Sequence, residues 1–101
     1  STTTYLPQFC HAVTFELIKE GALYSDGTSK PDLGFVDDPL DTGGQTKGGI
    51  SQRAFPHLDI ASLSLDQIVR IYHARYWRTA HCASWPPAVA LCLFDAAIPS
   101  F

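Results

Sequence analysis

The sequence has few of the residues that mark nucleic-acid binding or membrane insertion. Its 101 residues carry seven lysines and arginines against ten aspartates and glutamates, a formal charge of −3, without a basic cluster. Because nucleic-acid binding depends on neutralising phosphates, we do not expect nucleic acid as a partner. The N-terminus lacks a basic segment followed by an apolar one, and no apolar run has the length of a membrane span. We therefore expect neither a signal peptide nor membrane insertion.

Cysteine is also scarce, and its spacing predicts neither disulfides nor a metal site. The chain has three cysteines, without a Cys-x-x-Cys pair: Cys10, Cys82 and Cys92. An odd number without such pairs indicates free thiols in a reducing cytoplasm. His73, His81 and Cys82 match no common zinc spacing, so we expect no metal and no cofactor. Calcium binding by Asp37, Asp38 and Asp41 is conceivable, although the EF-hand pattern is absent.

What the chain does have is enough apolar sequence for one small core. Hydrophobic residues make up 46% of the composition, which suits a single domain over residues 1–101. The spacing of apolar residues predicts helices at about 7–20, 51–55, 64–78 and 86–97. A capping box at Ser64 and Gln67 opens the third helix, and the fourth is apolar nearly all round, so it should be the buried central helix. Asp95 within it needs a partner such as an arginine or a backbone amide.

Only two glutamates occur, Glu16 and Glu20, four residues apart in the first predicted helix. Glu16 is interpreted as a solvated helix residue or as a partner of Lys19 or Lys47. Glu20 stands just before Gly21, the natural stop of that helix. The negative end of a helix disfavours an ionised carboxylate, and a carboxyl group that keeps its proton suits a general acid.

Residues 22–50 form a region of loops and possible short strands, rich in glycine. Extended pieces near 22–24 and 35–36 could pair as a small hairpin, and the residues between them form either a β-finger or a plain surface loop. Further on, Asp41 supplies a carboxylate and Thr46 a hydroxyl. The spacing does not match a phosphate-binding loop. An acid, a second carboxylate and a hydroxyl that can hold water together indicate a hydrolase.

These residues resemble a known family. The pattern Glu-Gly, then Asp-Pro-x-Asp-x-Gly-Gly-x-Thr-x-x-Gly-Ile, runs from Glu20 to Ile50 and is similar to that of the phage and bacterial N-acetylmuramidases of glycoside hydrolase family 108. The likeness extends from Phe9 to about Ala97 through these blocks: Leu65-Asp66, Ile71-Tyr72, Tyr76-Trp77, Pro86-Pro87 and Phe94–Ala97. The chain departs from the pattern in having Ala22 for a second glycine, an insertion at about 23–35, and Gly48 for an aromatic residue. It also ends where the family continues into a further helical half.

The resemblance implies a mainly α, lysozyme-like α+β domain, the N-terminal catalytic part of an endolysin-type enzyme. It implies cleavage of the β-1,4 bond between N-acetylmuramic acid and N-acetylglucosamine in peptidoglycan. In that reaction Glu20 would be the acid, Asp41 would stabilise positive charge or help activate water, and Thr46 would hold the water. Implied substrate contacts are Gly43, Gly44, Gly49, Tyr76 and Trp77. The protein would be made in a bacterial cytoplasm without a signal peptide and act at the cell wall, in host lysis or on a virion.

Several alternatives stay open. Tyr76 and Trp77 stand at helical spacing, and aromatic residues there more often fill a core than bind sugar. The chain could be a non-catalytic module that binds cell wall or builds a phage particle. It could also be a fragment, or the first half of a split enzyme that a second polypeptide completes. A peptidase has less support, because no Cys-His signature is present.

Overall fold

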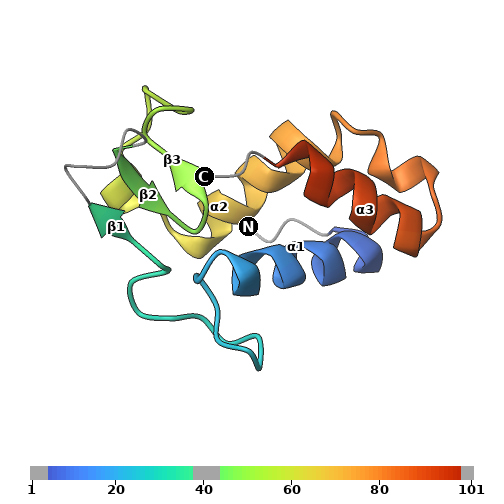
Figure 1. The fold of residues 1–101 in the computed structure, drawn as a ribbon, viewed down its shortest axis with the longest axis horizontal. Helices are drawn as coiled ribbons and strands as arrows, with labels where there is room; N and C mark the ends of the chain where they lie inside the picture. The colour runs from blue at the N-terminus through green and yellow to red at the C-terminus, as the bar shows by residue number, and fades with distance from the viewer. Residues whose placement is uncertain (1–4, 38–43, 99–101) are drawn as a thin grey trace.

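A computed structural model describes residues 5–37 and 44–98 (Figure 1). Within these ranges lie three α-helices, α1 (Pro7–Lys19), α2 (Leu65–Tyr72) and α3 (Pro87–Ala97), and three short strands, β1 (Val36–Asp37), β2 (Gln45–Lys47) and β3 (Ile50–Ser51). Figure 1 shows the strands at the left, α1 and α3 at the right, and α2 running between them. The predicted mainly α fold with a small β region is confirmed. None of the described helices is both long and apolar enough to cross a bilayer.

Helix α1 follows the prediction to within one residue. Pro7 stands in its first turn, where a missing N–H costs nothing. Its end is a Schellman cap, in which Gly21 N–H donates to Ile18 O at 3.1 Å and Ala22 N–H donates to Leu17 O at 2.9 Å. Gly21 adopts the positive φ of 82° that this cap requires. Glu20 is thereby held as the C-cap residue, directly after the last residue of the helix.

Helix α2 begins as predicted and then changes its hydrogen bonding. The Ser64 and Gln67 side chains form the expected capping box. From His73 to Trp77 the helix continues with π-helical bonds, and Arg78 N–H reaches back to His73 O at 3.0 Å. The single helix predicted at 64–78 is thus an α-helix followed by a π-helical segment.

The three strands form one antiparallel sheet in the order β1-β2-β3. Thr46 in the central strand is paired with Val36 on one side and Ser51 on the other. The hairpin considered between 22–24 and 35–36 is wrong, because Leu23 instead bridges to Ser29 and Val36 joins β2. Residues 23–35 lie in a loop whose turn is closed by Asp26, which accepts hydrogen bonds from Thr28.

The helix predicted at 51–55 is also wrong. Ser51 is extended because it pairs with Thr46 in the sheet. After it the chain makes one turn, in which Phe55 N–H donates to Ser51 O at 3.0 Å. Pro56 follows directly and cannot donate the next backbone bond, so the turn does not grow into a helix.

The core forms where the three helices meet. Its largest fully buried apolar side chains are Phe9, Leu17, Ile50, Ile60, Ile68, Tyr72 and Phe94. Trp77 is buried and packs edge-on against Phe9 and Phe94, with ring centroids 5.3 and 5.4 Å apart. The packing interpretation of Trp77 is therefore confirmed.

Helix α3 is not the buried central helix that its composition predicts. Within the helix only Ala90 and Phe94 are buried, whereas Val89 is 43% exposed and Cys92 is also exposed. The helix packs one face on α1 and on the segment 73–77. The prediction failed because an all-apolar helix can be one-sided when the described chain supplies only one neighbouring layer.

Candidate active site

Glu20 lies where the end of α1 meets the turn between β2 and β3. Gly49 in that turn has a φ of +81°, and a Cβ added to it would lie 3.0 Å from Glu20 Cγ and 3.3 Å from Cδ. The Glu20 side chain therefore lies directly against the Gly49 backbone, which only glycine allows at this distance. The half-buried carboxyl is placed by the helix cap on one side and by this glycine on the other.

Tyr72 completes this arrangement from α2. Its side chain is fully buried, and its hydroxyl donates a hydrogen bond to Gly48 O at 2.7 Å. The Cβ added to Gly49 would also overlap the Tyr72 hydroxyl, so Glu20, Gly49 and Tyr72 meet at one point. Burial, and then the negative charge of Glu20, raise the pKa of Tyr72, so the phenol keeps its proton as a hydrogen-bond donor.

In the sequence, Tyr72 stands out only as part of the Ile71-Tyr72 block of the family pattern, without a predicted role of its own. Periodicity identifies the face of a helix but not the partner of a hydroxyl on that face. A tyrosine among aliphatic core positions does indicate a polar contact in the core, because a buried Tyr hydroxyl normally has a hydrogen-bond partner.

Thr46 is the other predicted catalytic residue that lies within the described part of the chain. It is half-buried in the middle of β2, and its pairing puts it on the same face as Val36 and Ser51. Gly49, which lies against the Glu20 side chain, follows Thr46 by three residues. Gly44, with φ of +71°, precedes β2 and faces Gln52. Asp41 and Gly43 lie outside the described residues.

Tyr76 and Trp77, the predicted aromatic substrate contacts, are both buried, with 9% and 2% of their surface exposed. Trp77 also contributes to the wall of an open cavity of about 440 Å³ that His73, Arg78 and His81 line. Their burial favours packing as the main role. Contact of either ring with sugar stays a prediction.

Glu16 lies one turn before Glu20 and is fully buried, so its interpretation as a solvated residue is wrong. Among the described residues neither of its carboxyl oxygens accepts a hydrogen bond. Lys19 Nζ, the expected partner, is 3.9 Å from Oε2 and is itself exposed, while Lys47 donates instead to Ala61 O. A carboxylate so placed is costly, because burial penalises its charge.

Asp95 on α3 explains how this burial is tolerated. Lys19 Nζ donates to Asp95 Oδ1 at 2.8 Å, so the partner of Asp95 is a lysine and not the expected arginine or backbone amide. Burial, followed by the neighbouring Asp95, raises the pKa of Glu16 to about 7. The contacts with Glu16 and Lys19 lower the pKa of Asp95. Glu16 therefore keeps its proton up to a higher pH than an exposed glutamate does, which lowers the cost of burying it beside the Asp95 carboxylate.

No group of three or more histidine, cysteine or acidic side chains within residues 5–37 and 44–98 is placed to hold a metal ion. His73 instead packs its ring on Phe9 and Tyr5, with centroids 4.8 Å apart in each pair. Cys82 is buried, and burial raises the pKa of its thiol. Of the three aspartates considered for calcium, Asp38 and Asp41 lie outside the described residues.

Comparison with protein families agrees with this geometry. The model of the family described as glycosyl hydrolase 108 matches residues 17–100, a span that includes Glu20, Thr46, Gly49 and Tyr72. Searches of curated proteins and of solved structures return no match. The chain therefore belongs to the glycosyl hydrolase 108 family and is a glycoside hydrolase of the muramidase type, with peptidoglycan as its substrate.

Proposed function

We propose that the chain hydrolyses the β-1,4 bond between N-acetylmuramic acid and N-acetylglucosamine, with Glu20 as the general acid. The observation that carries this proposal is the position of Glu20, held at the end of α1 against Gly49 and beside the Tyr72 hydroxyl. Glu20 gives its proton to the glycosidic oxygen as the bond to the anomeric carbon breaks. A carboxyl fixed by backbone on two sides meets the geometric demand on such an acid.

Asp41 and Thr46 have the remaining roles in this proposal. Asp41 stabilises the positive charge that develops on the sugar ring, or helps to activate the water. Thr46 holds the water whose oxygen bonds to the anomeric carbon, and the proton that this water loses goes to a carboxylate, either Asp41 or Glu20 after it has given up its own proton. Support for Thr46 comes from its place in the central strand, three residues before the glycine that contacts Glu20.

The biological setting is part of the same proposal. The protein would be made in the cytoplasm of a bacterial host and would act at the cell wall, in host lysis or during infection from a virion. Wall degradation is the process that this chemistry serves.

Glu20→Gln tests the proposed acid, because the amide keeps the shape of the side chain but cannot give up a proton. We expect release of reducing ends from purified peptidoglycan to fall by at least about 100-fold. Asp66 is an exposed carboxylate paired with Arg70, so Asp66→Asn is the matched control and should keep wild-type activity. Wall hydrolysis by a folded Glu20→Gln variant at the wild-type rate would rule out Glu20 as the acid.

A second candidate function is favoured by helix α3. Its exposed apolar side would be covered by a second polypeptide if the chain were a wall-binding or virion module, or one half of a split enzyme. Light scattering of the purified chain, run beside a peptidoglycan pull-down and the reducing-end assay, separates the candidates. Wall binding by the pure chain without release of reducing ends supports the module, whereas hydrolysis by the pure monomer supports the enzyme.

A further inference from the structure

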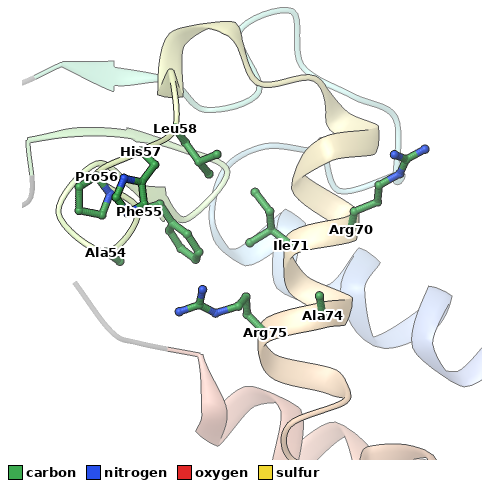
Figure 2. Close-up of a pocket in the computed structure, with 9 residues that line it drawn as sticks. All are labelled: Ala54, Phe55, Pro56, His57, Leu58, Arg70, Ile71, Ala74 and Arg75. Atoms are coloured by element: carbon green, nitrogen blue, oxygen red, sulfur yellow. The ribbon is translucent and has the colours of Figure 1, made fainter.

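A large cavity lies apart from Glu20, between the loop 54–58 and the helical segment 70–75 (Figure 2). Its volume is about 610 Å³, within the range of sites for small ligands. The residues that line it are Ala54, Phe55, Pro56, His57, Leu58, Arg70, Ile71, Ala74 and Arg75. None of the residues assigned to glycosidic cleavage is among them.

The lining combines an apolar surface with one available cation. Figure 2 shows Arg75 extending from the helix toward Phe55, and its guanidinium carbon lies 5.1 Å from the ring centroid. Arg70 points away from the loop and is paired with Asp66 at 3.1 Å. Arg75 has no carboxylate partner within the described part of the chain, and no acidic residue lines the cavity. In a chain of net charge −3, the Arg75 charge is therefore available to pair with an anion.

The loop that forms one wall is held in place by Gln52. The Gln52 side-chain amide donates to Phe55 O at 3.0 Å and to Leu58 O at 2.9 Å. Leu58 N–H also donates to Phe55 O at 3.1 Å. The cavity is therefore preformed, and a ligand would not have to order this loop on binding.

Both walls are continuous with the candidate active site. The loop 54–58 follows β3, whose last residue, Ser51, pairs with Thr46. On the other wall Ile71 immediately precedes Tyr72, whose hydroxyl lies beside Glu20 and Gly49. Each wall of the cavity is therefore joined along the chain to a residue of the candidate active site, Thr46 through its pairing with Ser51 on one wall and Tyr72 on the other.

We propose that this cavity binds the peptide stem of peptidoglycan, which is attached to the muramic acid residues of the glycan. The stem is a short peptide of alanine and of residues that carry free carboxylates. Alanine methyl groups suit the apolar surface of Phe55, Ile71 and Ala74, and a stem carboxylate suits the planar guanidinium of Arg75. This inference rests on the proposed function, and it assigns the cavity to recognition of the part of the substrate that is not cleaved.

Arg75→Gln tests the inference on two substrates, intact peptidoglycan and glycan chains whose stems have been removed by an amidase. We expect kcat/KM for intact peptidoglycan to fall by about tenfold, with no change for the stripped glycan. Arg53→Gln removes an equal charge from an exposed position near the loop that does not line the cavity, and should change neither value. Ala74→Leu fills the cavity from an exposed helix position without touching the charge, and should reproduce the loss.

Equal effects of Arg75→Gln on both substrates would overturn the inference and leave the proposed function intact. If the wild-type chain hydrolyses neither substrate, the proposed function fails, and direct binding decides the inference. In that measurement, N-acetylmuramyl-L-alanyl-D-isoglutamine should shift the backbone NMR signals of Phe55 and Ala74, and N-acetylglucosamine, which has neither a peptide nor a carboxylate, should not. Shifts that are absent, or that persist unchanged in Arg75→Gln, contradict the assignment.

Discussion

Helices α1 and α3 pack against each other, and the burial of each is the opposite of what its composition suggests. Helix α1 buries a carboxyl group, Glu16, completely. Helix α3, the more apolar of the two, leaves Val89 and Cys92 exposed. The salt bridge between Lys19 and Asp95 joins the two helices near the buried acid.

The difference follows from what surrounds each helix. The end of α1 is enclosed by α3, by α2 through Tyr72, and by the turn at Gly48 and Gly49. Helix α3 has neighbours on one side only. We infer that the enclosed end of α1 is the part of the molecule least tolerant of change, and that the outer side of α3 is the most tolerant.

The largest effect should come from Gly49→Ala, which places a methyl group at the enclosed end. The positive φ disfavours alanine, and its Cβ overlaps the Tyr72 hydroxyl and crowds Glu20. We expect a loss of about 3 kcal/mol in the free energy of unfolding and of roughly 100-fold in peptidoglycan hydrolysis. Urea unfolding and the reducing-end assay measure the two losses.

Tyr72→Phe sharpens this test, because it removes the hydroxyl that the new methyl group would meet. The double variant should be more stable than the sum of the two single losses predicts. Strict additivity would show that the methyl group and the hydroxyl do not compete for the same space.

The next effect is a pH dependence of stability caused by Glu16. Lys19, Glu20, Asp95 and Tyr72 are the charged or titratable groups that face it. Because folding raises the pKa of Glu16 from 4.5 to about 7, its stabilising contribution is complete below pH 4.5 and is lost as the pH rises through 7. The loss is on the order of 3 kcal/mol, measured as the difference in unfolding free energy between pH 5 and pH 8.

Glu16→Gln is the control, since glutamine keeps the shape of the acid but does not titrate. Its stability should change much less between pH 5 and pH 8, which separates Glu16 from the four histidines. Asp95 acts with the opposite sign: folding lowers its pKa, so its contribution is lost at more acidic pH. A wild-type stability that rises from pH 5 to pH 8 would contradict the buried-acid interpretation.

The smallest effect should come from Val89→Ser on the outer side of α3. Val89 is 43% exposed, so we expect less than about 0.5 kcal/mol change in the free energy of unfolding of the isolated chain. Thermal unfolding followed by circular dichroism measures it. A loss above about 1.5 kcal/mol would show that this side is covered in solution, and the contrast between α1 and α3 would disappear.

Local sequence signals predicted most of the secondary structure. Pro7 and Gly21 bracket α1, and Ser64 with Gln67 opens α2, because caps and breakers act within a few residues. The helix expected at 51–55 failed partly for a non-local reason, since the pairing of Ser51 with Thr46 holds Ser51 extended. The exposed side of α3 was not predicted for a similar reason, because the composition of a helix does not show how many of its sides other elements cover.

The sequence alone determined the family pattern, both ends of α1 and the start of α2, and it singled out Glu20 as the candidate acid, because these depend on residue type and short spacing. The tertiary structure alone brought Tyr72 to Glu20 and Gly49, buried Glu16 beside Asp95, and formed the cavity beneath Arg75. Each of these contacts joins residues that are 20 or more positions apart in the chain. Such contacts depend on how elements pack, which spacing along the chain does not encode.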